Sequence, residues 1–287
     1  MSTDCTLVTC EQIPALDPDD RLLAEDLRDR GLTVAVATWT DPGVDWSASR
    51  SCVLRSTWDY HVRYDEFLAW INRVQTQTRL INSAPLLKWN AHKRYLRDLE
   101  SAGVPVVPTF WLNAGERAAL GEICETRGWE SVVIKPARGA AAHDVLRVAR
   151  DAPGLARGQA HVERLLQSDD VLVQAYLASV ETLGERALVF VDGRGTHAVV
   201  KKPFDTLLAV NADPSTLSQP APEERAVAAL ALAAMPGASL YARIDLLHDA
   251  QGHPVVSELE VIEPTLYFGV FPKASAALAD AIARELQ

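Results

Sequence analysis

Three carboxylates and an arginine stand at alternating positions in two neighbouring segments near the C-terminus: Arg243, Asp245, Glu258 and Glu260. Both segments, 241–247 and 255–264, have the pattern of strands, and Gln251-Gly252 between them predicts a tight turn. Such a turn pairs Asp245 with Glu258 and Arg243 with Glu260, so all four side chains share one face. Acids held this closely need cations, and oxygen ligands of this kind suit Mg²⁺ together with substrate phosphates. The pattern predicts a metal–nucleotide site, although the wet face of an ordinary hairpin would look similar.

Lysines that could bind the phosphates occur at two earlier points: Lys93 and Lys135. Lys135 ends a strand-like run and precedes a loop of small residues that includes Gly139 and Ala140, whose N–H groups could approach an anion closely. Lys93 falls in the first turn of a helix predicted from Asn90 to Gly103, where a cation is unfavourable unless a phosphate is near. Taken alone, it would be an ordinary surface lysine. Neither GxxxxGK[ST] nor a helix-opening GxGxxG occurs, which disfavours two familiar nucleotide folds.

The first 82 residues alternate predicted strands and helices, which indicates a small parallel α/β sheet. Its expected strands are 5–9, 32–38, 51–55 and 79–82, and its expected helices are 19–30 and 67–74. Ligands of parallel sheets collect where the strands end. Arg55, Ser56 and Asp59 directly follow a buried strand and are therefore candidate substrate-binding residues. The alternative is a capped turn that buries Trp58 and Tyr60.

Composition limits the class of protein. The 287 residues include 48% hydrophobic residues and carry a formal net charge of −10, which predicts a globular protein of two or three domains that binds neither nucleic acid nor anionic membranes. The four cysteines lack metal-ligand spacing, so we expect buried thiols. No signal peptide or long apolar run is evident, and a cytoplasmic location is expected. An alanine-rich helix over 274–286 fits either core packing or a homodimer contact.

The order of these features resembles the ATP-grasp superfamily, in which two α+β lobes close on Mg-ATP. The resemblance covers residues 83–272, and the N-terminal unit resembles the small domain that precedes ATP-grasp modules. It implies a mixed α/β and α+β fold: an N-terminal parallel-sheet pre-ATP-grasp domain (1–84), a first ATP-grasp part (85–175) and a C-terminal lobe with the metal site (176–287). The first ATP-grasp part would include a lid lobe over about 104–173.

The resemblance also assigns residues. It implies ATP contacts for Lys93, Lys135, Gly139, Ala140, Gln174, Ala175, Tyr176, Leu177, Glu181, Glu185 and Lys201. Lys93 and Lys135 would grip the phosphates, and with Arg243 they would spread the charge of the transition state. The hinge at 173–177 would cradle adenine, and Glu185, with Glu181 as the alternative, would hold the ribose. Lys202 could replace Lys201. Asp245, Glu258 and Glu260 would hold Mg²⁺, two ions in all, although the superfamily usually has asparagine where Glu260 stands.

Three phrases, RSTWDY, NAHKRYL and GERALVF, most resemble the O-ureido-D-serine cyclo-ligase family, which uses ATP to close the D-cycloserine ring. The resemblance implies an antibiotic-biosynthesis ligase that activates a small amino-acid-type carboxylate as an acyl phosphate. A C–N bond would then form, with release of ADP and phosphate. Arg55, Ser56, Asp59 and Arg186 would contact the substrate. The alternatives are an intermolecular amino-acid or dipeptide ligase, an ATP-grasp kinase, and a non-catalytic ATP-binding protein.

Overall fold

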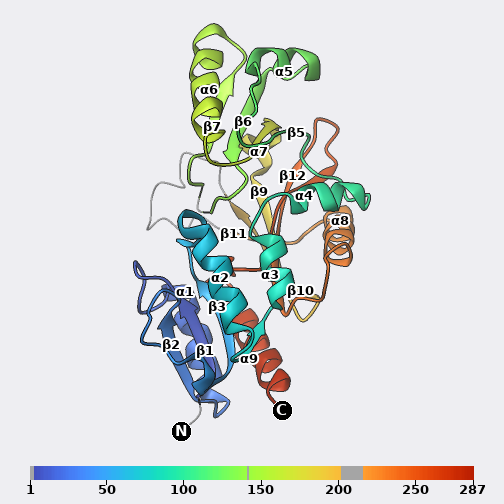
Figure 1. The fold of residues 1–287 in the computed structure, drawn as a ribbon. Helices are drawn as coiled ribbons and strands as arrows, with labels where there is room; N and C mark the ends of the chain where they lie inside the picture. Colours follow the sequence, from blue (N-terminus) through green and yellow to red (C-terminus); the bar gives the residue numbers. More distant parts are fainter. Residues whose placement is uncertain (1–2, 141, 202–215) are drawn as a thin grey trace.

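The computed structural model describes residues 3–140, 142–201 and 216–287, whose strands form three sheets (Figure 1). The N-terminal sheet is parallel in the order β2-β1-β3-β4, as the alternating pattern predicts. Its elements are β1 (Thr3–Thr9), α1 (Pro18–Asp29), β2 (Val34–Thr38), η1 (Trp46–Ala48), β3 (Ser49–Ser56), η2 (Tyr60–Arg63), α2 (Tyr64–Val74) and β4 (Arg79–Ile81). Helix α1 begins where predicted because Asp17 accepts a hydrogen bond from the Asp19 N–H and Pro18 suits the first helical position.

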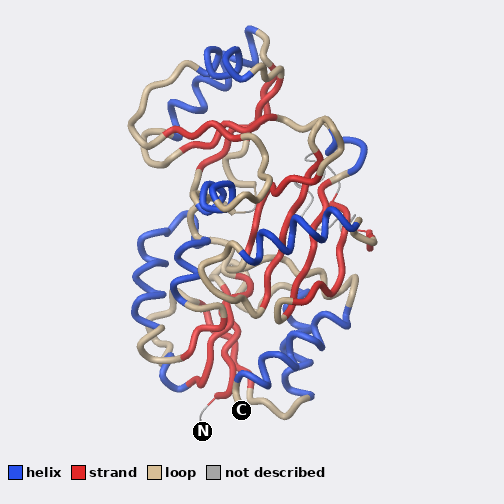
Figure 2. The backbone as a smooth tube through the Cα atoms, turned by 90° about the vertical axis from the view of Figure 1, so that its right-hand side faces the viewer, coloured by secondary structure: helices blue, strands red, loops and turns tan. Residues whose placement is uncertain are grey.

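The second sheet lies at the far end of the molecule from both termini and has the order β5-β8-β6-β7, with antiparallel pairs (Figures 1 and 2). The elements of this middle part are α3 (Ala84–Asn90), α4 (Tyr95–Ser101), β5 (Thr109–Leu112), α5 (Leu120–Arg127), β6 (Ser131–Pro136), β7 (Leu146–Ala149), α6 (Ala152–Leu165) and β8 (Val171–Ala175). Gly158 allows α6 to approach its neighbours, because a Cβ there would lie 2.5 Å from Leu120 Cδ2. We call the unit of β5–β8, α5 and α6 the lid lobe.

The third sheet has the order β11-β10-β9-β12-β13. Its part of the chain contains α7 (Ser179–Leu183), β9 (Glu185–Val191), β10 (Arg194–Lys201), β11 (Thr216–Ser218), α8 (Pro222–Ala233), β12 (Tyr241–His248), β13 (Pro254–Glu260) and α9 (Pro272–Glu285). Asp192 and Gly193, with φ of 51° and 70°, form the hairpin turn between β9 and β10.

The β12–β13 hairpin has the predicted register but not the predicted turn. Asp245 pairs with Glu258 and Arg243 pairs with Glu260, as expected. The connection is the five-residue segment 249–253 rather than a two-residue turn, and Leu246 pairs with Val256. One extra residue, Ser257, therefore bulges out of the ladder and restores the register at the acids.

The single helix predicted from Asn90 to Gly103 is wrong. Asn90 is the last residue of α3, and α4 begins only at Tyr95. Lys93 lies in the connection between these helices, where its backbone N–H donates to the Ala137 carbonyl of the lid lobe at 2.8 Å. Asn90 does not cap a helix, because its side chain is buried and forms hydrogen bonds with the backbone of Leu259 and Val261.

The C-terminal helix completes the core of the N-terminal unit. Leu278 and Ile282 of α9 are fully buried and share one hydrophobic cluster with Leu23 of α1 and Leu7 of β1. The other face of the same sheet packs against α2 through a second cluster. Core packing is therefore the outcome for the helix predicted over 274–286.

Two further expectations concern the state of the cysteines and the presence of membrane-spanning helices. All four cysteines are buried free thiols, as predicted, and burial raises the pKa of Cys5 and of Cys52 to about 12. Among the described residues, no helix combines the length and the apolar character needed to cross a bilayer.

A half-buried imidazole on β10 predicts a pH dependence of stability. His197 stacks on Phe271 with ring centroids 4.9 Å apart, and burial lowers its pKa to about 4. Between pH 6.5 and 4 the unfolded chain binds the proton that the folded chain excludes, so this contribution is complete above pH 6.5 and is lost as the pH falls. We expect His197→Phe to reduce the loss of unfolding free energy between pH 7.5 and 5 by on the order of 1 kcal/mol, allowing for solvent screening.

Urea unfolding at the two pH values measures this effect. His253→Gln is the control, because its side chain is 70% exposed in the β12–β13 connection. Equal pH dependence of wild type and His197→Phe would contradict the expectation.

Candidate active site

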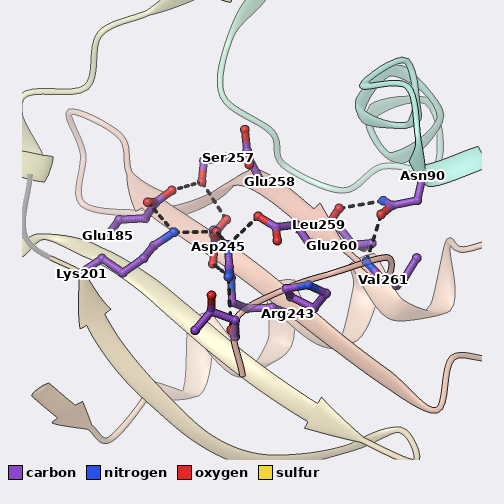
Figure 3. A network of polar contacts seen from close by, with 12 residues as sticks. Asn90, Glu185, Lys201, Arg243, Asp245, Ser257, Glu258, Leu259, Glu260 and Val261 are labelled. Carbon is purple, nitrogen blue, oxygen red and sulfur yellow. Dashed lines mark hydrogen bonds and ion pairs between the residues drawn. The ribbon is translucent and has the colours of Figure 1, made fainter. Parts of the chain in front are cut away.

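Three carboxylates converge on one face of the β12–β13 hairpin, and we call them the acid patch: Asp245, Glu258 and Glu260. They can each present an oxygen within 4.8 Å of the others (Figure 3). Arg243 forms a two-pronged ion pair with Asp245, at 2.9 Å for each bond, and also bonds Glu260. The predicted grouping of four charged side chains is therefore present.

Three lysines from different parts of the chain reach this patch. Lys93, from the α3–α4 connection, and Lys135, from β6 of the lid lobe, lie 3.0 and 3.2 Å from the same Glu258 oxygen. Lys201, at the end of β10, lies 2.6 Å from Asp245 and 2.8 Å from Glu185. Glu258 thus joins the lid lobe to the third sheet, and the three lysines expected to contact ATP lie together at the acid patch.

The pKa values of Glu258 and Glu260 in the acid patch shift in opposite directions. Burial alone would raise the pKa of Glu258, but the ammonium groups of Lys93 and Lys135 outweigh it and hold that pKa well below its usual range. Burial raises the pKa of Glu260 to about 7; Arg243 opposes this rise, while Asp245 and Glu258 reinforce it. A divalent cation would relieve the repulsion at Glu260, so the donor set fits Mg²⁺, which prefers carboxylate oxygens.

Two polar residues that the sequence analysis missed position β13. The Asn90 side chain donates to Leu259 O at 2.7 Å and accepts from Val261 N–H at 2.9 Å, which fixes the strand on both sides of Glu260 (Figure 3). Ser257, the bulged residue, donates to Glu185 at 2.6 Å and lies 3.0 Å from Asp245 O. Asn90 has the sequence signal of a helix cap, and Ser257 has no signal beyond its place in a strand.

The loop between β6 and β7, residues 137–145, is in contact with the N-terminal unit. The Arg138 guanidinium lies over the Tyr64 ring, 5.1 Å from its centroid, and the His143 and His61 rings are 5.0 Å apart. At Gly139 a Cβ would lie 3.3 Å from the Pro136 ring, so a larger residue would crowd the turn. Gly139 and Ala140 therefore lie on a loop held beside Lys135, and the next residue is outside the described part.

The predicted adenine hinge lies at the end of β8. The Gln174 amide donates to Thr109 Oγ1 at 2.9 Å and is buried in the lid sheet, whereas Ala175, Tyr176 and Leu177 lead out of it. Tyr176 donates to Glu181 at 2.6 Å, and Arg147 stacks on the Tyr176 ring. Glu181 is thus held at the lid surface, whereas Glu185 belongs to the network of the acid patch.

The residues predicted to contact substrate after β3 are already linked to other groups. Arg55 donates to Asp20 at 2.8 Å and to the Pro264 carbonyl at 2.7 Å, and Ser56 donates to the same Asp20 at 2.7 Å. Asp59 accepts from the Trp39 indole N–H at 2.7 Å. Asp20 has only the signal of a first-turn acid in sequence, so its role in this junction was missed.

Arg186 lies on the opposite face of the third sheet from Glu185, because side chains alternate along β9. It bonds Ser218 and lies 3.5 Å from Glu224 of α8, in the layer between sheet and helix. These partners give Arg186 a packing role. Lys202, the alternative to Lys201, lies outside the described residues.

A lid lobe whose lysine meets carboxylates on the third sheet, preceded by a small parallel domain, is the arrangement of the ATP-grasp superfamily. A crystal structure of D-alanine–D-alanine ligase from Bacillus anthracis, complexed with ATP, shares the fold: the match covers 99% of this chain and 97% of that chain with a TM-score of 0.67 at 15% identity.

More similar proteins place the chain within this class. The cycloserine biosynthesis protein DcsG of Streptomyces lavendulae is 37% identical over 295 residues, covering 98% of each chain. The crystal structure of D-cycloserine synthetase DcsG matches with a TM-score of 0.88 and 34% identity over 99% of both chains. The family defined by the N-terminal domain of D-cycloserine synthetase DcsG matches residues 5–82. The chain belongs to the DcsG family of ATP-grasp ligases.

Proposed function

We propose that this ligase activates the carboxylate of a small amino-acid-type substrate with ATP and then closes a C–N bond within the same molecule, as in D-cycloserine formation. The observation that carries the proposal is the meeting of Lys93 and Lys135, from two parts of the chain, at Glu258 of the acid patch. A site that binds only a metal ion needs no lysines beside its carboxylate ligands. A site that binds a metal ion together with a triphosphate needs such lysines to neutralise the phosphate charge.

The chain contributes charge and position. Asp245, Glu258 and Glu260 would hold Mg²⁺, two ions in this proposal, which when bound neutralise charge on the phosphates. Lys93 and Lys135 bind the transferred phosphoryl group from two sides, and Arg243 stabilises the charge that develops beside Asp245. The hinge at 173–177 faces adenine in this assignment, and Glu185, with Glu181 as the alternative, binds the ribose.

The reaction needs no side-chain nucleophile. A substrate carboxylate oxygen attacks the γ-phosphorus and ADP leaves, which forms an acyl phosphate. The substrate nitrogen then attacks the acyl carbon, the C–N bond forms, and phosphate leaves with the electron pair of the broken C–O bond while the nitrogen loses a proton. Arg55 and Asp59 remain candidates for the substrate side, because Nη1 of Arg55 has no hydrogen-bond partner among the described residues. Ser56 belongs to the same junction through Asp20.

The test is release of ADP and phosphate from Mg-ATP with a panel of D- and L-amino acids that includes O-ureido-D-serine. Release of both products in equal amounts, dependent on one amino acid and accompanied by a cyclic product, supports the proposal. A product that joins two amino acids would make the protein an intermolecular ligase. A phosphorylated product without free phosphate would make it a kinase, and binding of ATP without release for the whole panel would contradict ligation.

The contact of the 137–145 loop with the N-terminal unit predicts a graded effect on ATP use. Tyr64→Leu removes the ring under Arg138, so we expect kcat/KM for ATP to fall about 3- to 10-fold, the value of a partly exposed cation–π contact. Tyr64→Phe keeps the ring face and should stay within about twofold of wild type. Steady-state kinetics at saturating amino acid measure this difference.

Arg127→Ala is the matched control, because Arg127 stacks on Phe110 and Trp129 inside the lid lobe without reaching the N-terminal unit. If Arg127→Ala and Tyr64→Leu lower kcat/KM equally, the loop contact has no special role.

A further inference from the structure

The segment between β13 and α9 contains a carboxylate that the reaction above does not use. Glu263 is only 8% exposed. Among the described residues its side chain makes no hydrogen bond or ion pair with another side chain. A buried carboxylate in this state destabilises the protein unless a cation or a donor meets it. Because it lacks a side-chain partner in the described part of the chain, Glu263 is a candidate for binding a cationic group of a ligand.

The backbone around Glu263 is held from three sides. Tyr241 donates to the Ile262 carbonyl at 3.0 Å, and Arg55 donates to the Pro264 carbonyl at 2.7 Å. Arg243 donates to the Thr265 carbonyl at 3.2 Å. The side chain between these fixed peptides has a defined position, as a specificity-determining group requires.

Hydrogen bonds place the segment around Glu263 between the acid patch and the N-terminal unit: Arg243, the partner of Asp245, donates to the Thr265 carbonyl, and the Tyr241 hydroxyl lies 2.7 Å from Leu54 O of β3 and 3.0 Å from Ile262 O. Burial raises the pKa of Glu263 well above its usual range; the nearby Glu260 raises it further, while Lys93 and Arg243 oppose. Burial raises the pKa of Tyr60, in the segment after β3, and the charge of Glu263 adds to this rise. Glu263 thus lies on a segment bonded both to Arg243 beside the acid patch and, through Tyr241, to the strand that precedes the loop predicted to bind substrate.

We propose that Glu263 binds the α-ammonium group of the amino-acid substrate and thereby directs the substrate carboxylate toward the phosphate bound by Lys93. This assignment rests on the proposed function and names its substrate class. An amino acid carries one ammonium and one carboxylate, so the ammonium pairs with the lone acid and the carboxylate turns toward the cations. A carboxylic acid without the ammonium would leave Glu263 unpaired and would bind weakly.

The experiment is titration calorimetry in the presence of Mg²⁺ and a non-hydrolysable ATP analogue. The two probes are O-ureido-D-serine and its analogue without the amino group, 3-(ureidooxy)propanoic acid. We expect the wild type to prefer the first probe by about 10- to 100-fold, the range of a charge-assisted hydrogen bond. Glu263→Gln should lose this preference to within about threefold, Glu263→Asp should keep part of it, and the Kd for the ATP analogue should not change in either variant.

Controls separate a ligand role from a structural one. Glu224→Gln is the matched substitution, because Glu224 is also buried but pairs with His248 of its own layer; it should keep the wild-type preference. Without substrate, Glu263→Gln should unfold at the same temperature as wild type or higher, since it removes an unpaired acid. A retained preference in Glu263→Gln, or a clear fall of its Tm, would overturn the assignment.

Measurements of binding and of turnover distinguish a failure of the proposed ligation from a failure of the Glu263 assignment. A wild type that binds O-ureido-D-serine without releasing phosphate refutes the ligation but leaves the assignment of Glu263 to be decided by the Kd values. Turnover with an unchanged preference in Glu263→Gln refutes the assignment alone. A wild type that binds neither probe refutes both.

Discussion

Glu258→Gln is expected to lower kcat for substrate-dependent ADP release about 1000-fold while leaving the fold intact. The substitution keeps the shape but removes the charge that meets both Lys93 and Lys135, at 3.0 and 3.2 Å. It also removes one of three carboxylates of the acid patch, so binding of Mg²⁺ and charge neutralisation in the transition state fail together. The measurement is coupled ADP and phosphate release over a titration of Mg²⁺.

Glu122→Gln is the control for this change, because Glu122 is exposed on α5 of the lid lobe. A Glu258→Gln variant that retained more than a tenth of wild-type kcat would remove Glu258 from the centre of the site. Partial recovery at high Mg²⁺ would instead indicate that metal affinity carries most of the effect.

Lys135→Met is expected to reduce kcat/KM for ATP about 100- to 1000-fold, the second-largest effect. Lys135 is 7% exposed, and burial lowers its pKa, with the attraction of Glu258 only partly compensating. The ammonium is therefore costly to hold in place, and methionine of similar length removes the charge without leaving a hole. We expect Tm to stay equal or rise while ATP use is lost.

The control is Lys273→Met, on the exposed start of α9. If Lys135→Met lowered Tm by several degrees in step with activity, Lys135 would be a structural partner of Glu258 rather than a phosphate ligand.

The acid patch was predictable because strand periodicity and charge both act over a few residues. Asp245 and Glu258 were paired correctly even though the predicted turn was wrong, since the longer connection and the bulge at Ser257 offset each other. A bulge depends on contacts of the extra residue, here with Glu185, which lies 72 positions away. No local pattern contains that contact.

Residues that join separate units were the least predictable. Arg55 looked like a substrate ligand after a strand, but its main partners are Asp20 and the Pro264 carbonyl, 209 positions away. Asn90 looked like a cap because a polar residue before an apolar stripe usually is one, yet it fixes β13. Arg186 was assigned to the substrate from the family resemblance, while alternation along β9 places it on the face opposite the acid patch.

The burial of α9 against α1 and β1 has a consequence for the order in which the protein can fold during translation. Translation produces the four strands of the N-terminal sheet well before the residues of α9, and both termini lie at one end of the molecule (Figure 1). Until α9 has been made, the face that Leu278 and Ile282 cover stays exposed, as apolar surface does in folding intermediates. The N-terminal unit therefore reaches its final form only after α9 has been synthesised, and by then every residue of the acid patch has been made as well.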